Sequence, residues 1–278
     1  MLTRADLFIG VGFDPVELVA RPWTYSQPIV SLTSWPMYQR VAPSIEAVGE
    51  VCTLLRDVGA MLASPIEWTE DEVRRLAATQ RAKMRPVPHA DGDGLLPHRV
   101  VDLSVERYRG ARITVDAGAH MFPVMALWPA TEPGDVLISN GLSTMGFALP
   151  AAIGAALLDR SRPTVVFTGD GGLLMCLGEL RTAARERLPL RVIVFDDRDL
   201  SLISVKQKQR GYRTDSTQMG PVDWASVGTG LGLLARAVDN EASLAQCLRE
   251  TKEVPGPVLI GARIDGREYE DSIKVLRG

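Results

Sequence analysis

The sequence predicts an α/β fold in two parts: a parallel sheet flanked by helices on both faces, preceded by part of a doubly wound α/β domain. Two observations predict it. Short, continuously apolar runs bounded by Gly, Pro or Asp alternate with stretches of helical periodicity, which is typical of parallel strands joined by crossover helices. With 278 residues, 46% of them hydrophobic, the chain is expected to form two domains with a sizeable core. Its 31 Lys and Arg and 34 Asp and Glu are spread along the chain, so the net charge of −3 does not favour nucleic acid or a membrane as a partner.

The first part, residues 1–66, has the pattern of only half a doubly wound domain. Apolar runs at 7–12 and 29–32 predict strands, and an amphipathic run over 44–62 predicts a helix. A helical linker is expected at 67–96, because Thr69 and the acidic residues after it resemble a helix start and the helical pattern reaches about Lys83. Pro and Gly then interrupt the pattern, so the second domain is expected at 97–278.

The second domain contains the apolar runs of a parallel sheet, separated by helical stretches. The predicted strands are 113–116, 136–139, 164–168, 191–195 and 258–261, and the predicted helices are 151–158, 173–187 and 241–250. The uncharged run 136–158 is long enough to cross a bilayer, but its polar residues and glycines indicate a buried turn and helix instead.

Three widely spaced cysteines, Cys52, Cys176 and Cys247, form no Cys-x-x-Cys pair and are read as reduced, buried side chains. The apolar stretch near the N-terminus lacks a small-residue cleavage site. Both observations favour a cytoplasmic protein.

Acidic turns follow two of the predicted strands. Gly169-Asp170-Gly171-Gly172 ends one strand and Asp196-Asp197 ends the next, with Asp170 and Asp197 27 positions apart. That interval is one strand-to-strand crossover, so both side chains are expected at the same carboxyl edge of the sheet. Two carboxylates beside glycines suit Mg²⁺ that also holds a diphosphate. The alternative, that these acidic residues only cap helices and turns, stays open on spacing alone.

Three segments, taken in order, resemble the thiamin-diphosphate-dependent enzymes, and the acetolactate synthases in particular. They are Asp116-Ala117-Gly118-Ala119-His120, the run from Asn140 through Pro150 to Ala155, and Gly169-Asp170-Gly171 followed by Glu179-Leu180, Leu188-Pro189-Leu190 and Asp197. The resemblance covers about 95–265, which implies the pyrophosphate-binding domain of that family. Residues 1–65 look like the C-terminal part of its central, Rossmann-like domain.

The resemblance implies which residues hold the cofactor. Asp170, Asp197 and a backbone carbonyl at Asp199 would bind magnesium; the family usually has Asn where Asp197 stands, and Asp adds a negative charge. The residues expected to contact thiamin diphosphate are Gly118, His120, Ser143, Met145, Gly169, Gly171, Gly172 and Met175. For His120 the alternative is a histidine that satisfies a loop carbonyl, and for Met145 it is core filling.

The segment after Asp199 occupies the place where the family shapes its substrate pocket, so Leu202 and Ile203 are expected to face a small 2-oxo acid. Lys206, Lys208 and Arg210 could attract its carboxylate, or could be charges on an exposed helix.

The family activates its cofactor with a Glu from a separate pyrimidine-binding domain, and no such domain is recognisable here. Glu46, Glu50 and Glu67 match nothing in the family and are read as solvated. The catalytic residue is therefore left unassigned, and the chain is expected to be a subunit of a split enzyme, or a truncated form, that is inactive alone. Its oligomer would include a chain with the pyrimidine domain.

The expected function is decarboxylation of a 2-oxo acid such as pyruvate, with or without carboligation. The alternative is a non-catalytic or relic module that binds the cofactor. A nucleotide-binding dehydrogenase based on Gly10-x-Gly12 is weaker, because Pro15 stands where the fingerprint requires its third glycine.

Overall fold

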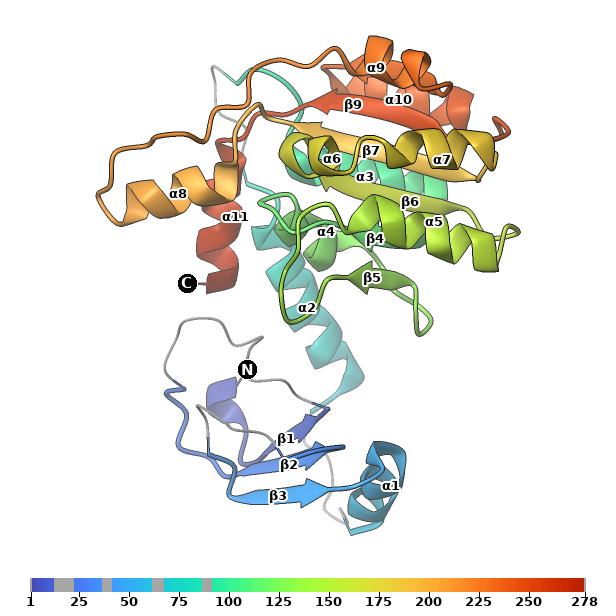
Figure 1. Ribbon diagram of the computed structural model, residues 1–278. Helices are drawn as coiled ribbons and strands as arrows, with labels where there is room; N and C mark the ends of the chain where they lie inside the picture. The colour runs from blue at the N-terminus through green and yellow to red at the C-terminus, as the bar shows by residue number, and fades with distance from the viewer. Residues whose placement is uncertain (1, 13–22, 37–41, 62–67, 87–91, 278) are drawn as a thin grey trace. The chain divides into compact units, whose positions relative to one another are not determined.

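The computed structural model describes residues 2–12, 23–36, 42–61, 68–86 and 92–277 (Figure 1). The chain divides into two compact units, Met1–Ala78 and Thr79–Gly278.

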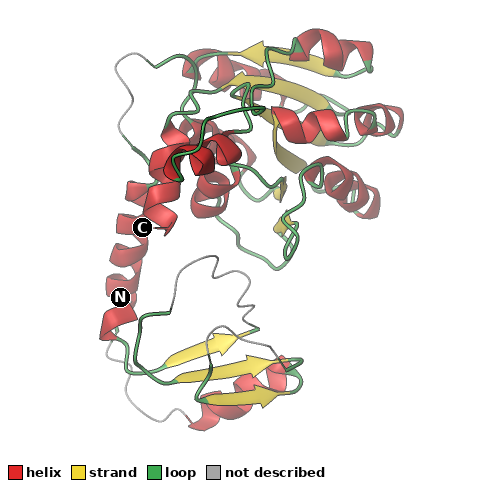
Figure 2. Cartoon of the chain, turned by 60° about the vertical axis from the view of Figure 1, so that its left-hand side comes forward, coloured by secondary structure: helices red, strands yellow, loops and turns green. Residues whose placement is uncertain are grey.

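The first unit contains a parallel sheet in the order β1-β2-β3 (Figure 2). Its elements are η1 (Leu2–Arg4), β1 (Phe8–Val11), β2 (Ile29–Thr33), β3 (Ile45–Val48) and α1 (Val51–Met61), followed by the start of α2 (Glu70–Lys83). The expectation of one helix over 44–62 is wrong, because its first residues form β3. The hydroxyl of Thr69 accepts the N–H of Glu72 at 3.2 Å, so the predicted start of α2 is confirmed.

The second unit is built on a six-stranded parallel sheet in the order β5-β4-β6-β7-β9-β8. The strands are β4 (Arg112–Val115), β5 (Val136–Ile138), β6 (Thr164–Gly169), β7 (Leu190–Asp196), β8 (Leu234–Val238) and β9 (Val258–Arg263). The alternation of side chains along each strand separates two cores. Phe167 and Phe195 enter one core, whereas Val166 and Val194 enter the other.

Helices cover both faces of this sheet, as the sequence predicts. One core receives side chains from α3 (Pro97–Tyr108), α4 (Met121–Leu127), α10 (Glu241–Thr251) and α11 (Glu268–Arg277). The other receives them from α5 (Ala148–Leu158), α6 (Asp170–Met175), α7 (Glu179–Arg185) and α9 (Trp224–Gly230). The remaining helix, α8 (Ser201–Gln209), follows β7 and lies beyond the strand ends (Figure 1).

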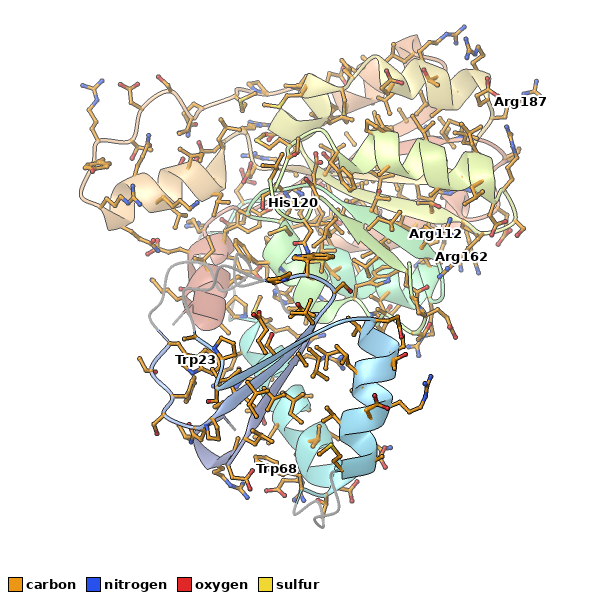
Figure 3. The ribbon with its side chains drawn as sticks, turned by 60° about the horizontal axis from the view of Figure 1, so that its bottom comes forward. Trp23, Trp68, Arg112, His120, Arg162 and Arg187 are labelled. Carbon is orange, nitrogen blue, oxygen red and sulfur yellow. The ribbon has the colours of Figure 1, made fainter. Side chains whose placement is uncertain are left out.

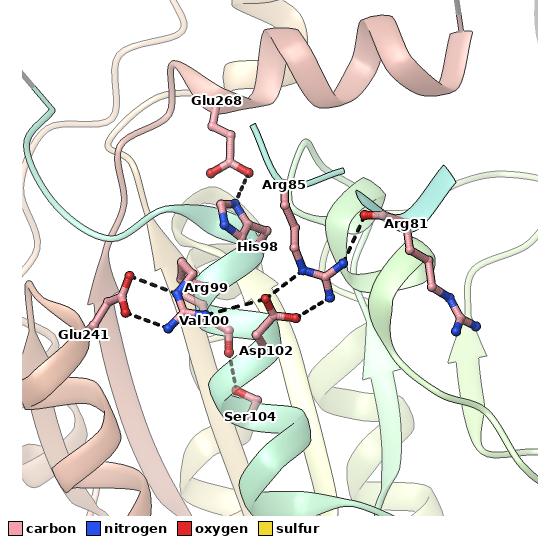
Figure 4. Close-up of polar contacts among 9 residues, drawn as sticks. All are labelled: Arg81, Arg85, His98, Arg99, Val100, Asp102, Ser104, Glu241 and Glu268. Carbon is pink, nitrogen blue, oxygen red and sulfur yellow. Dashed lines mark hydrogen bonds and ion pairs between the residues drawn. The ribbon is translucent and has the colours of Figure 1, made fainter. Parts of the chain in front are cut away.

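Polar contacts fix α3 to the elements around it (Figure 4). Nδ1 of His98 lies 2.7 Å from Oε1 of Glu268 on α11, and both side chains are buried. Arg99 forms two hydrogen bonds to Glu241 on α10, at 3.0 and 2.8 Å. The start of α3 is thus tied to α10 and α11, which follow it by more than 130 residues in the sequence.

Strands β6 and β7 are direct neighbours, with Gly169 paired to Phe195. The residues that follow them therefore emerge side by side at the carboxyl edge of the sheet, as the crossover argument predicts. The long apolar run 136–158 forms β5, a turn and α5. No described helix has the length and apolar character needed to cross a bilayer.

Candidate functional site

The turns after β6 and β7 are joined by a hydrogen bond. Oδ2 of Asp170 accepts the N–H of Arg198 at 2.8 Å, and Oδ1 of Asp170 accepts the N–H of Gly171 at 2.6 Å. Arg198 has a φ of 61°, a left-handed conformation that is uncommon for a residue other than glycine. This conformation turns the backbone directly after Asp197 toward Asp170.

The turn after β7 is also fixed from within. Oδ1 of Asp197 accepts the N–H of Asp199 at 3.2 Å, while its Oδ2 accepts the hydroxyl of Ser201. Asp199 accepts the hydroxyl of Ser204 with one oxygen, and its other oxygen is buried without a hydrogen-bond partner among the described residues. The turn therefore holds carboxylate oxygens in an ordered position beside Asp170.

Burial makes this corner unfavourable for negative charge. Burial, with neighbouring carboxylates as a smaller cause, raises the pKa of Asp170 to about 6. Burial, followed by the charge of Asp170, raises the pKa of Asp197 to about 7. A divalent cation would relieve both effects. Among the described residues no three His, Cys, Asp or Glu side chains form a metal cage, so a cation here would also need backbone, phosphate or water oxygens, as Mg²⁺ commonly does.

His120 lies beside the same turn, in the interior of the unit (Figure 3). Its ring stacks on Phe195 with 5.4 Å between centroids. A β-carbon on Gly118 would lie 2.6 Å from Cε1 of His120, and one on Gly169 would lie 3.3 Å from Nδ1. Glycine at 118 therefore leaves room for the imidazole ring.

One nitrogen of His120, Nε2, is buried and has no hydrogen-bond partner within the described part of the chain. Burial lowers the pKa of His120 to about 4, against the opposing charge of Asp116, so the imidazole is neutral at neutral pH. A neutral imidazole with hydrogen on Nε2 can donate to a phosphate oxygen. The unsatisfied nitrogen therefore fits a diphosphate better than it fits the alternative of a histidine that satisfies a loop carbonyl.

Apolar side chains gather over Gly171. A β-carbon there would lie 2.7 Å from Cδ2 of Leu200, 3.4 Å from Cε of Met145 and 3.9 Å from Cε of Met219. Sequence reasoning named Met145 but missed Leu200 and Met219. Met219 lies near Gly171 because its N–H donates to the carbonyl of Arg198 at 2.8 Å. No periodicity in the sequence predicts this pairing.

The 139–147 loop, which connects β5 to α5, carries Ser143 and Met145. Ser143 is exposed and has a φ of 48°. Gly146, with a φ of 75°, brings the loop against α6, where its β-carbon would lie 3.5 Å from Cβ of Met175. Met175 itself is 65% exposed. The structure thus brings Met145, Met175 and the glycines at 171 and 172 close together, whereas Ser143 is exposed.

The residues expected to face substrate are less well placed. Leu202 packs against the core and Ile203 is 45% exposed. Asp197 and Asp199 line a cavity of about 500 Å³ between α8 and α11, but Leu202 and Ile203 do not line it. Lys208 does line this cavity, whereas Lys206 is half-buried and Arg210 is exposed.

Of the three glutamates of the first part, the structure describes Glu46 and Glu50. Glu46 is exposed. Glu50 caps α1, because its carboxylate accepts the N–H groups of Cys52 and Thr53 and the hydroxyl of Thr53, and these bonds lower the pKa of Glu50 to about 2. Glu67 lies outside the described residues, as does Pro15.

Residues 116–262, more than half of the chain, match the family described as thiamine pyrophosphate enzyme, C-terminal TPP binding domain. The catabolic acetolactate synthase of Raoultella terrigena is 29% identical over 275 residues, which are 96% of this chain and 49% of that protein. The large subunit of acetolactate synthase isozyme 1 of Escherichia coli (strain K12) is 37% identical over 221 residues, 76% of this chain and 39% of that one. The chain spans about half the length of the curated relatives it matches.

A solved structure shares the fold. The thiamine diphosphate-dependent 4-hydroxybenzoylformate decarboxylase of Rhodococcus jostii RHA1 superposes with a TM-score of 0.77, covering 96% of this chain and 50% of that one at 19% identity.

Proposed function

This chain belongs to the thiamine pyrophosphate enzymes, and on that premise we propose that it binds thiamin diphosphate and Mg²⁺ at the carboxyl edge of β6 and β7 as part of an acetolactate synthase-like enzyme. The observation that carries the proposal is the hydrogen bond from the N–H of Arg198 to Asp170. It joins the two acidic turns into one corner, beside the unsatisfied Nε2 of His120 and the apolar side chains over Gly171.

Each residue would have a distinct role at this site. Asp170, Asp197 and the backbone carbonyl of Asp199 would bind the cation. His120 would donate a hydrogen bond to the diphosphate, and Gly169 and Gly171 would let it approach the backbone. Met145, with Leu200 and Met219, would pack against the organic rings and exclude water. When bound, the cofactor supplies a carbon nucleophile and an electron sink for the loss of carbon dioxide from a 2-oxo acid.

The reaction would be decarboxylation of a small 2-oxo acid such as pyruvate, with or without ligation to a second one. The relatives support this reaction, because they are described as acetolactate synthases. We propose that the carboxylic acid that activates the cofactor comes from a pyrimidine-binding domain on a partner chain. We also propose a cytoplasmic location, in line with three free cysteines.

Titration calorimetry with thiamin diphosphate in excess MgCl₂ tests the site. The wild-type chain should bind, and Asp170→Ala should weaken binding by at least about a hundredfold, because the variant loses a metal ligand and the acceptor for Arg198. Asp71→Ala, an exposed carboxylate of α2, is the control and should bind as the wild type does. Equal affinity of the wild type and Asp170→Ala would rule out the metal assignment.

Turnover tests the need for a partner. The purified chain should release no carbon dioxide from pyruvate alone and should do so when the amino-terminal half of an acetolactate synthase large subunit is added. Turnover by the chain alone would exclude the partner proposal. Binding without turnover in either mixture would assign a cofactor-binding module instead of an enzyme.

A further inference from the structure

Asp116, at the end of β4, is 1% exposed and accepts four hydrogen bonds. Its Oδ1 accepts the N–H groups of Phe147 and Ala148 at 2.7 and 2.9 Å. Its Oδ2 accepts the N–H of Gly146 at 3.0 Å and the hydroxyl of Thr168 at 2.9 Å. Both oxygens of this buried carboxylate are thus fully used.

The four donors come from segments that meet around the proposed cofactor. Gly146, Phe147 and Ala148 directly follow Met145 and begin α5, while Thr168 is two residues before Asp170. A third segment touches the same carboxylate, because a β-carbon on Gly172 would lie only 2.3 Å from Oδ2 of Asp116. The position of Asp116 therefore requires glycine at 172, independently of any contact with the cofactor.

The chemistry of the contacts selects Asp at this position. Three N–H groups can only donate, so an amide in place of the carboxylate would set an NH₂ group against at least one of them. Oδ2 of Asp116 already lies against Gly172, which leaves no room there for the longer side chain of Glu. The negative charge also lies at the positive end of α5, where it is favourable. Since the amides of residues 146–148 already donate to Asp116, the loop offers a bound anion few N–H groups and presents Met145 instead.

We propose that Asp116 is a positioning residue: it holds the 139–147 loop, and with it Met145, at a fixed distance from the Gly-Asp-Gly turn. This inference rests on the proposed function, since the pocket that it shapes is the proposed cofactor site. Asp116 need not touch the cofactor. It sets where Met145 lies relative to Gly171, and so the apolar surface against which the rings would pack.

The chain offers a matched control. Asp135, 2% exposed and directly before β5, accepts the N–H groups of Thr131 and Glu132, both at 2.7 Å, and the hydroxyl of Thr131 at 3.1 Å. It also pairs with Arg162, which lies apart from His120 in Figure 3. Asp116→Asn and Asp135→Asn therefore change comparable buried acceptors. Asp116 lies at the carboxyl ends of the parallel strands, whereas Asp135 lies at their amino ends.

The experiment compares the wild type with both variants by amide hydrogen exchange and by calorimetry with thiamin diphosphate and Mg²⁺. Asp116→Asn should speed exchange at residues 146–148 by about tenfold or more and weaken cofactor binding by about tenfold or more. Asp135→Asn should change neither by more than about twofold, although it lowers the melting temperature. Unchanged exchange and affinity in Asp116→Asn, or an equal loss of affinity in Asp135→Asn, would overturn the inference.

Thr168→Val keeps the inference testable if Asp116→Asn does not fold. Valine matches the shape of threonine but removes one donor to Asp116, so binding should weaken by about threefold, and Thr168→Ser should restore it. Wild-type affinity in Thr168→Val would count against the positioning role. A wild-type chain that binds no thiamin diphosphate would refute the proposed function, while the exchange data would still decide whether Asp116 holds the loop.

Discussion

Asp170 and Asp197 lie in the same buried site, where burial disfavours the charged form of each carboxyl group and the charge of Asp170 adds to the effect on Asp197. Raised pKa values of about 6 and 7 mean that the folded chain binds protons more tightly here than the unfolded chain does. Without a cation, this contribution to stability is therefore present at low pH and is lost as the pH rises through 6 and 7. A bound cation requires both carboxylates without their protons, so binding releases protons.

The first prediction concerns pH. Mg²⁺ affinity in the presence of thiamin diphosphate should rise by about fivefold between pH 6.5 and pH 8, because fewer protons must be displaced. Calorimetry across this range measures it; His120, whose pKa is lowered to about 4, contributes little there. Asp197→Asn should still bind, with a smaller pH dependence, because one titrating ligand is gone. Equal Mg²⁺ affinity at both pH values would contradict the prediction.

At the scale of single residues, the sequence predicts which residues belong to the site better than it predicts which side chains contact one another there. Asp170, Asp197 and His120 could be named because they follow strands or resemble a family segment. Leu200 and Met219 could not, because they reach Gly171 through the antiparallel bridge between Asp199 and Gln218, and pairing between irregular segments leaves no repeat in the sequence. Cys52, expected to be buried, is exposed, since α1 buries none of its described side chains.

At the scale of elements, Arg191 ties the start of β7 to the connection between α10 and β9. Its guanidinium donates to the carbonyls of Gly256, Lys252 and Val254 at 2.7–2.9 Å, and to that of Leu190 at 3.0 Å. It is 5% exposed, and burial lowers its pKa. One planar guanidinium thereby pairs three carbonyl groups of the connection between α10 and β9.

The second prediction follows from this geometry. Arg191→Lys should reduce the free energy of unfolding by about 2–4 kcal/mol, because an ammonium group cannot reach four carbonyls arranged around a guanidinium. Urea denaturation measures the loss. Arg236→Lys on β8, an exposed arginine with one hydrogen bond to the carbonyl of Ala235, is the control and should change stability by less than about 0.5 kcal/mol. A similar effect of both substitutions would show that the carbonyl contacts contribute little.

Elements with strong apolar runs were predicted well, and short or exposed ones were not. The strands at 164–169 and 190–196 are buried on both faces, and their sequences show it. The expected helix over 173–187 is two helices, α6 and α7, separated by residues 176–178. Strand β8, Leu-Ala-Arg-Ala-Val at the sheet edge, was missed because half-exposed side chains give it no continuous apolar run.

At the scale of the whole molecule, the two units differ in how much they bury. Of the described residues of Met1–Ala78, only Ser31, Leu32 and Thr33 are buried, and Ile45 on β3 is 61% exposed. The second unit has two extensive cores, one on each face of its sheet. Burial of apolar surface is the main source of stability, so the units should not be equally stable.

The third prediction is that the units unfold in separate steps. Residues 1–78 should exchange amide hydrogens faster and melt at a lower temperature than residues 79–278, because few of their side chains are buried. Calorimetric scans combined with hydrogen exchange by mass spectrometry measure both. Thiamin diphosphate with Mg²⁺ should raise only the upper transition. A single transition with uniform exchange would show that the units form one cooperative body.

The pairing of β6 with β7 has a consequence for how much the intervening chain can vary. The interval between Asp170 and Asp197 is one passage along α6 and α7 to the amino edge and one return along β7. Arg187 is exposed and lies at the amino edge of the sheet. Extra residues inserted after it would lengthen the connection between α7 and β7 without moving the turn at Asp170 or the turn at Asp197. Two residues inserted there should be tolerated, whereas the same insertion after Arg198 should abolish binding. Related chains can therefore differ in the number of residues between these two aspartates. A sequence motif that requires a fixed spacing would miss such chains.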